Sequence, residues 1–227
     1  MRPVLQDGLV VSCQPVQGGP LDRPDIVAAF ALAAEAGGAR GLRIEGLANL
    51  RAVRAVTALP VIGLIKRIDP ATPVIITGLP ADVRDLAEAG ADIVAFDATR
   101  RPGRLTPVAT LVEAARAAGC ASMADCADLA DAEAAVRAGA DTVGTTLSGY
   151  TGGPVPDEPD IDLVRRCAAL PRPVFAEGRY RTLEQVRAAR AAGARVVVVG
   201  SAITRPEHVT SWFVGALREP LAGQAGR

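Results

Sequence analysis

The sequence predicts an α/β protein built as a single (β/α)8 TIM barrel with eight parallel strands. Eight short apolar runs lack the alternation of a half-exposed strand, which is typical of strands buried on both faces. Ala-rich helical segments separate these runs, and eight such units within 227 residues favour a closed barrel. An open doubly wound sheet is the alternative. It is disfavoured because no G-x-G-x-x-G motif follows the first run and no P-loop motif is present.

The expected strands follow directly from the apolar runs. They are Leu9–Cys13, Gly41–Ile44, Val61–Ile65, Ile93–Phe96, Ala121–Ala124, Thr142–Gly144, Val174–Ala176 and Val196–Val199.

A recurring Ala-Gly phrase marks where helices end. Glycine after the last helical turn can adopt a left-handed conformation, from which the chain enters the next strand. The expected helix-to-strand joints are Ala36-Gly37-Gly38, Ala89-Gly90, Ala118-Gly119, Ala138-Gly139 and Ala192-Gly193.

Helix starts and buried faces can also be predicted. Thr106-Pro107 indicates an N-cap followed by a proline in the first helical position, and Thr182 with Gln185 fits a capping box. The expected apolar helix faces are Ile26 with Phe30 and Ala33, Leu183 with Val186, and Val209 with Trp212, Phe213 and Ala216.

The composition excludes several classes of protein. A net charge of zero and 3% aromatic residues give no basis for binding nucleic acid or a membrane. No stretch approaches 18 apolar residues, and Met1–Gly8 has no hydrophobic signal core. The four cysteines form no C-x-x-C pair, so we expect them to be reduced and structural in a cytoplasmic protein.

The length suits one core rather than two. We therefore expect residues 1–217 to form the barrel and residues 218–227, rich in Gly, Ala and Pro, to form a loose tail.

Polar side chains follow nearly every expected strand. In TIM barrels the active site lies at the carboxyl ends of the strands, so these side chains should converge on one mouth. They are Gln14, Arg43 with Glu45, Lys66, Asp97, Asp125, Thr145 with Thr146, Glu177, and Gly200 with Ser201.

Lys66 is the only lysine, against twenty-four arginines. An ammonium loses its proton readily when desolvated, whereas a guanidinium does not. Lys66 could therefore act as a general base or as a Schiff-base nucleophile. Glu177, if close, would supply a second proton-transfer group, while Asp97 and Asp125 could bind hydroxyls or orient the lysine. We expect no metal, because the only histidine, His208, is expected on the surface.

Two further segments indicate a ligand. Gly178 after the seventh strand and Gly200-Ser201 after the eighth match the recurrent phosphate cradle of these barrels, and Arg205 could add a charge-assisted contact. The long segment 146–159, which includes Tyr150, is typical of a lid or binding loop for a polar ligand.

At these same residues the chain resembles the N-acetylmannosamine-6-phosphate 2-epimerase family over residues 9–213. The Gly-Thr-Thr-Leu-Ser-Gly-Tyr-Thr octet and the Gly-Ser-Ala-Ile-Thr-Arg-Pro stretch are highly specific. The matching motifs are Val11–Gln14, Gly37–Arg43, Pro60–Arg67, Asp92–Thr99, Gly144–Thr151, Ala176–Tyr180 and Val199–Pro206.

The resemblance implies a TIM barrel without cofactor that interconverts N-acetylmannosamine 6-phosphate and N-acetylglucosamine 6-phosphate in amino-sugar and sialic-acid breakdown. It implies that Lys66 is the catalytic acid/base with Glu177 as its partner. Gln14, Arg43 and Asp125 would contact the sugar, and Gly200, Ser201 and Arg205 its phosphate. Whether one group or two serve the two faces of C2 stays open. Related barrels commonly associate, so a homodimer is expected.

Two segments depart from the family pattern. Cys126-Ala127-Asp128 stands where the family has an aliphatic residue and Ser-Thr, and residues 68–73 lack its aromatic character, with Gly78 where proline is common. Both flank the site, so we expect them to affect substrate selectivity rather than proton transfer.

Three alternatives remain open from the sequence. A strand-end lysine also suits a Schiff-base lyase or aldolase. A phosphosugar-binding protein without turnover would have the same phosphate cradle, and an epimerase for another hexosamine phosphate would have the same proton-transfer pair.

Overall fold

The computed structural model describes residues 5, 7–67, 76–104 and 106–218. Its eight strands are parallel and close into a barrel in chain order, with β8 pairing to β1, for example Val11 opposite Val199. The strands are β1 Gly8–Cys13, β2 Gly41–Glu45, β3 Val61–Leu64, β4 Ile93–Asp97, β5 Ala121–Asp125, β6 Thr142–Gly144, β7 Val174–Glu177 and β8 Val196–Val199. The predicted TIM barrel is confirmed and the open sheet is excluded.

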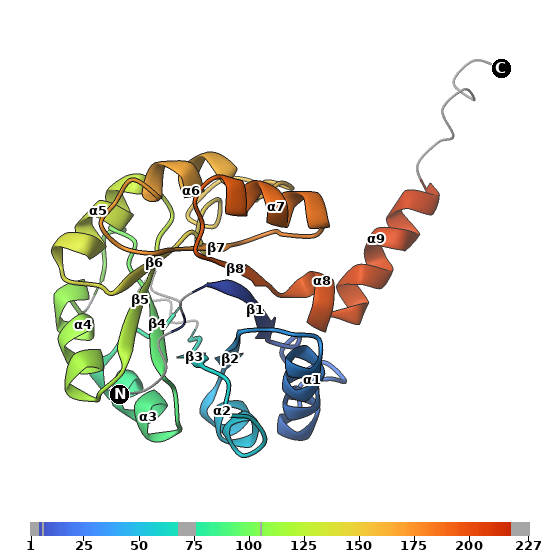
Figure 1. Cartoon of the computed structure of the whole chain (residues 1–227), viewed down its shortest axis with the longest axis horizontal. Coiled ribbons are helices and arrows are strands. Elements are labelled where there is room, and N and C mark those ends of the chain that lie inside the picture. Colours follow the sequence, from blue (N-terminus) through green and yellow to red (C-terminus); the bar gives the residue numbers. More distant parts are fainter. Residues whose placement is uncertain (1–4, 6, 68–75, 105, 219–227) are drawn as a thin grey trace.

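Helices surround this barrel (Figure 1). Each of the first seven follows its strand, and two follow β8. They are α1 Pro24–Ala36, α2 Leu47–Arg54, α3 Pro80–Glu88, α4 Val108–Ala117, α5 Leu129–Arg137, α6 Ile161–Cys167, α7 Leu183–Ala191, α8 Ser201–Thr204 and α9 Pro206–Arg218. Within the described ranges, no helix is both long and apolar enough to cross a membrane.

The joints between helices and strands agree with the glycine pattern. Gly38, Gly90, Gly119, Gly139 and Gly193 all have φ between 73° and 105°. The capping box of α7 is also confirmed, because Thr182 accepts from the Gln185 amide and the Gln185 side chain accepts from Thr182. The start of α4 differs by one residue from the prediction. The carbonyl of Pro107 accepts from Thr110, so Pro107, not Thr106, occupies the N-cap.

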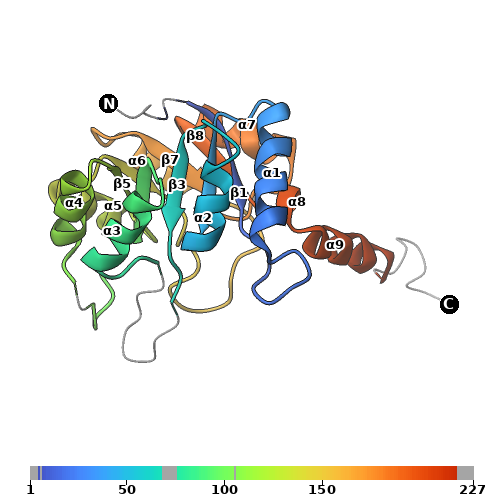
Figure 2. The same ribbon diagram turned by 90° about the horizontal axis from the view of Figure 1, so that it is seen from below.

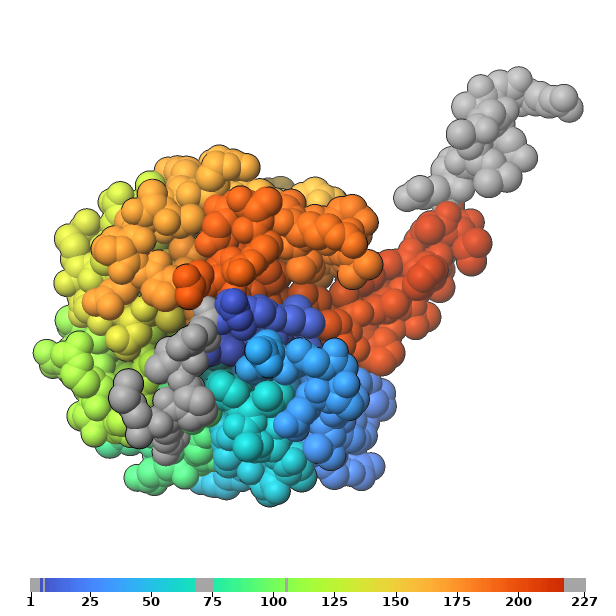
Figure 3. Space-filling view, viewed as in Figure 1, coloured from blue at the N-terminus to red at the C-terminus, as the bar shows by residue number. Residues whose placement is uncertain are grey.

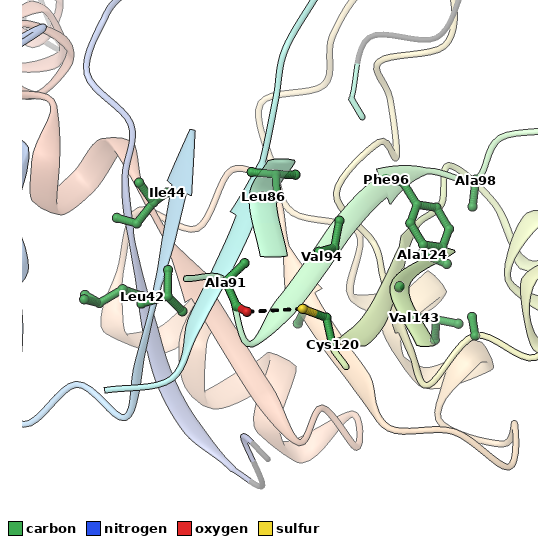
Figure 4. Packing of buried hydrophobic residues seen from close by; sticks show 14 of the residues in the cluster. Leu42, Ile44, Leu86, Ala91, Val94, Phe96, Ala98, Cys120, Ala124 and Val143 are labelled. Carbon is green, nitrogen blue, oxygen red and sulfur yellow. Dashed lines mark hydrogen bonds between the residues drawn. The ribbon is translucent and has the colours of Figure 1, made fainter. Parts of the chain in front are cut away.

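Alternation along the strands separates two apolar clusters. Val10, Ile93, Ala95, Phe175 and Val198 belong to the cluster inside the barrel. Their strand neighbours belong to the cluster between strands and helices, where Leu42, Val94, Phe96 and Ala124 pack with Leu86 from α3 (Figure 4).

The cysteines are part of these packed layers. All four are free and buried, and the Cys120 thiol donates to the Ala91 carbonyl at 3.2 Å (Figure 4). Burial raises the pKa of Cys13 to about 12 and that of Cys167 to about 11, so both thiols stay protonated. The prediction of reduced structural cysteines is confirmed.

The predicted helix faces were less accurate. In α1 the buried residues are Val27, Ala28 and Ala31, while Ala33 is exposed. In α7 only Ala189 is buried, and Leu183 is 70% exposed. The reason is that Ala-rich helices have apolar residues on several faces, so periodicity does not select the packed one.

Helix α9 differs most from expectation. It projects away from the barrel wall (Figures 1 and 3) and buries none of its residues. Phe213, expected on a packed face, is 71% exposed. The tail expected at residues 218–227 lies outside the described residues, apart from Arg218 at the end of α9.

Gly63 in β3 offers a test of how tightly helices pack on the barrel. A Cβ at this position would lie 2.9 Å from the Cβ of Ala91 and 3.2 Å from methyl groups of Leu50 and Leu86. Gly63→Ala is therefore expected to lower the free energy of unfolding by about 1–3 kcal/mol through overpacking, measured by urea denaturation. Gly215→Ala in α9 is the control, because beyond its chain neighbours and its own helix backbone nothing lies within 4 Å of the added Cβ. An equal loss in both variants would contradict the packing argument.

Candidate active site

The carboxyl ends of the strands open into a cavity of about 590 Å³. The loops that follow β1, β4 and β6 lie on the same side of the barrel (the lower side in Figure 2). Strand alternation explains why the expected polar residues turn inward. Arg43 lies between the outward-facing Leu42 and Ile44, and Glu177 lies two residues after the inward-facing Phe175.

Arg43 is at the centre of the site and is only 1% exposed. Its Nη2 lies 2.7 Å from Asp125 Oδ2 and its Nη1 lies 3.3 Å from Asp125 Oδ1, a bidentate pair. The same Nη1 lies 3.1 Å from Glu177 Oε2. Thr146 completes the network, because its hydroxyl donates to Asp125 Oδ1 at 2.6 Å and lies 3.3 Å from Glu177 Oε2.

One guanidinium therefore faces two buried carboxyl groups. Burial raises the pKa of Glu177 to about 7; Arg43 opposes this rise and Asp125 adds to it. The geometry accounts for the two smaller effects, because Arg43 is shared with Asp125 and the charge of Asp125 disfavours a second carboxylate nearby. Glu177 can thus hold a proton near neutral pH.

Lys66 follows β3, and its strand-end position is fixed by an antiparallel bridge to Ile76. The side chain is reached by solvent through the open cavity. Desolvation of the ammonium by the surrounding protein lowers the pKa of Lys66, and the charges of Arg43 and Arg205 lower it further, while Glu177 and Glu45 oppose them. The amine is thereby shifted toward the neutral form that a general base requires.

Four of the strand-end residues predicted to converge on the mouth do not line the cavity, namely Glu45, Asp97, Asp125 and Thr145. Asp125 lies behind Arg43 and Thr146. Asp97 is fully buried and engaged by its own loop, with Oδ2 2.8 Å from Arg101 Nη2 and Oδ1 3.1 Å from Arg104 Nη2. Thr99 donates to the same carboxylate at 2.6 Å. Through these contacts Asp97 holds the β4–α4 loop in place.

The glycines after β7 and β8 lie at the same cavity. Gly178, Gly200 and Ser201 line it together with Arg205. Arg205 is tied to the first strand's loop, because its Nε donates to the Gln14 carbonyl at 2.6 Å. Gln14 itself is 7% exposed, and its Nε2 donates to Ser12 Oγ at 2.9 Å.

The loop between β6 and α6 is held by Arg179, a residue not selected from the sequence. Arg179 donates to the carbonyls of Ser148 and Glu158, and its guanidinium carbon lies 5.4 Å from the centre of the Tyr150 ring. Its φ of 64° is unusual for a side-chain-bearing residue. The one sequence signal was its position directly after Gly178 at the strand end.

Other cavity residues were also missed. Ser12, Arg181 and Trp212 contribute to the lining, and so does His208, which was expected on the surface. Arg181 and Trp212 come from segments that the sequence alone does not place beside each other. Among the described residues, no group of three His, Cys, Asp or Glu side chains could hold a metal ion.

The lining is strongly cationic. Among the described residues that form it, Glu177 is the only acidic side chain. The cationic side chains of the lining are Arg43, Lys66, Arg179, Arg181 and Arg205. A cavity of this composition favours an anionic ligand.

The fold and the cavity at its strand ends define a TIM-barrel enzyme. Residues 27–219 match the family model described as "Putative N-acetylmannosamine-6-phosphate epimerase". The chain is 49% identical over 219 residues to the "Putative N-acetylmannosamine-6-phosphate 2-epimerase" of Glaesserella parasuis, which covers 96% of this chain and 94% of that protein. The protein of the same description from Yersinia pseudotuberculosis is 52% identical, again over 96% of this chain and 94% of that protein.

A solved structure gives the same result. The N-acetylmannosamine-6-phosphate 2-epimerase from Clostridium perfringens aligns with a TM-score of 0.89 and 36% identity, over 94% of each chain. The chain therefore belongs to the N-acetylmannosamine-6-phosphate 2-epimerase family, a family of carbohydrate isomerases. The resemblance found in the sequence is confirmed.

The raised pKa of Glu177 predicts a dependence of stability on pH. The folded state keeps the proton up to about pH 7, whereas the unfolded side chain loses it near pH 4.5. Compared with a variant that has a neutral side chain at position 177, the wild-type protein therefore keeps its full stability below pH 4.5 and loses part of it as the pH rises to about 7. Between pH 4.5 and 7.5, Glu177→Gln should gain on the order of 1–3 kcal/mol in unfolding free energy relative to wild type. Parallel pH profiles of the two proteins in urea denaturation would contradict this.

Proposed function

We propose that this protein interconverts N-acetylmannosamine 6-phosphate and N-acetylglucosamine 6-phosphate by removing and returning the proton on C2. The observation that carries the proposal is a titratable amine and a proton-holding carboxyl group at one cationic cavity. Family membership supports the substrate, since the relatives are named for this phosphosugar. The reaction would serve amino-sugar and sialic-acid breakdown.

The chemistry follows from the open-chain sugar. The C2 hydrogen is α to an aldehyde, so its removal by neutral Lys66 leaves an enolate whose negative charge needs support. Arg43, paired with Asp125, and protonated Glu177, which lies 3.1 Å from Arg43 and 3.3 Å from the Thr146 hydroxyl, would supply it. A proton delivered to the opposite face of C2 then gives the epimer. If Lys66 delivers it, the amine is neutral again at once; if Glu177 delivers it, the proton held by Lys66 must pass to Glu177 before the next turnover.

Binding of the rest of the substrate is assigned to the surrounding residues. Gln14, Thr146 and Tyr150 would contact the sugar. Gly178, Gly200, Ser201 and Arg205 would hold the phosphate. Asp125 would act through Arg43, and Asp97 through its loop. We assign all of this chemistry to residues 1–217 without a cofactor, and four reduced cysteines support a cytoplasmic setting.

Replacing Lys66 tests the proposal directly. Lys66→Ala should abolish exchange of the C2 hydrogen in heavy water, followed by proton NMR, while the circular dichroism spectrum stays that of the folded protein. Lys66→Arg should be equally inactive, because a guanidinium keeps its positive charge but does not lose a proton. Exchange near the wild-type rate in either variant would exclude Lys66 as the base.

The same samples separate the rival functions. Borohydride reduction with substrate should leave the protein unmodified; a covalent adduct at Lys66 would indicate Schiff-base chemistry instead. A phosphosugar-binding protein would hold the ligand without C2 exchange. An epimerase for another substrate would exchange a different hexosamine phosphate faster.

We also propose that the chain forms a homodimer through the outer face of α9. Phe213 and Leu217 lie four residues apart on one face and are 71% and 87% exposed. Val214 beside them is 40% exposed. Because this face packs on no part of the barrel, a second copy offers a matching apolar surface in a two-fold arrangement.

Charge placed on this face should weaken the dimer. The double variant Phe213→Glu, Leu217→Glu is expected to raise the dimer dissociation constant at least tenfold, since each protomer would have to desolvate two carboxylates on association. Sedimentation equilibrium measures this constant. Ser211→Glu, on another side of the helix, should leave association unchanged. Equal association of all three proteins would contradict the interface.

A further inference from the structure

One face of α9 turns toward the cavity. Arg205 directly precedes α9, and its carbonyl accepts from the amides of His208 and Val209. Arg205 is therefore the N-cap of this helix. Arg205, His208 and Trp212 are spaced by three and four residues, which places them on one side of the helix. All three line the cavity. Phe213 and Leu217 lie on a different side, so α9 has two functional faces.

The cavity-facing side of α9 stands at the proposed phosphate end. Gly178, Gly200 and Ser201 line the same cavity. Arg205 is held there by its hydrogen bond to the Gln14 carbonyl. The imidazole of His208, one helical turn beyond Arg205, lines the same cavity.

Arg181 contacts this side of α9 from the β7–α7 loop. Its guanidinium carbon lies 4.9 Å from the centre of the Trp212 ring, a cation–π contact between the β7–α7 loop and α9. Although α9 buries no residue completely, this contact and the bond from Arg205 help to hold its first turns at the cavity. Arg181 also adds positive charge to a cavity in whose described lining Glu177 is the only acidic side chain.

We propose that His208 is a further substrate-binding residue that donates a hydrogen bond to the phosphate group, and that the Arg181–Trp212 pair positions it. A neutral imidazole has one N–H donor and a charged one has two, so either form can serve. His208 would extend the cradle of glycine amides with a directional contact from α9. The proposal rests on the phosphorylated substrate of the proposed function.

Binding of inorganic phosphate tests the role of His208 without turnover. Trp212 is the only tryptophan in the chain, and its fluorescence should change when phosphate enters, with calorimetry as the second measurement. His208→Phe keeps the ring volume and removes the donor. It should raise the dissociation constant of phosphate and the KM of the sugar phosphate about tenfold, with kcat changed much less. His208→Gln keeps an N–H donor of similar reach and should recover most of the loss.

Two comparisons complete the experiment. Thr210→Ala, on the side of α9 away from the cavity, should bind phosphate as wild type does, whereas Arg205→Ala should bind it more weakly and raise KM more than it lowers kcat. Equal affinity of His208→Phe, His208→Gln and wild type would overturn the proposal even if C2 exchange is normal. Conversely, donor-dependent phosphate binding without C2 exchange would leave His208 assigned and refute the epimerase.

Discussion

The site depends on a single guanidinium shared by two buried carboxyl groups. Arg43 is nearly inaccessible, as is Asp125, and the two form a bidentate pair in the barrel interior. A charge in such a place is costly unless it is paired and hydrogen-bonded. Burial raises the pKa of Glu177 to about 7, and the nearby charge of Asp125 adds to this rise, while Arg43 opposes it. The acidity of Glu177 is thus set by its burial and by how Arg43 is divided between the two carboxyl groups.

The barrel makes this division possible. Its strands alternate between the inner and the outer apolar cluster, and inward positions near the ends of β2, β5 and β7 carry Arg43, Asp125 and Glu177 respectively. The alternation of the strands alone therefore directs all three side chains into the mouth of the barrel. Lys66 approaches from β3 on the neighbouring side, so the amine lies within the electrostatic influence of the network.

The strands and most of the site could be predicted from sequence because their signals are local. Apolar runs and the glycines that follow helices depend on the backbone alone, and the mouth of a barrel collects whatever ends its strands. Asp97 shows the limit: its partners Arg101 and Arg104 lie in its own loop, and sequence does not show whether such a carboxylate turns to a ligand or to its neighbours. The direction of α9 was missed because it depends on tertiary contacts, such as Arg181 with Trp212, between distant segments.

The scarcity of lysine has a practical consequence. Reagents that acylate primary amines meet only Lys66 among the side chains, and that amine is accessible through the open cavity. Its lowered pKa also increases the nucleophilic fraction at neutral pH. Apart from the α-amino group of the chain, electrophilic fragments that react with amines should therefore attach within the pocket, which makes this chain suited to discovery of covalent ligands.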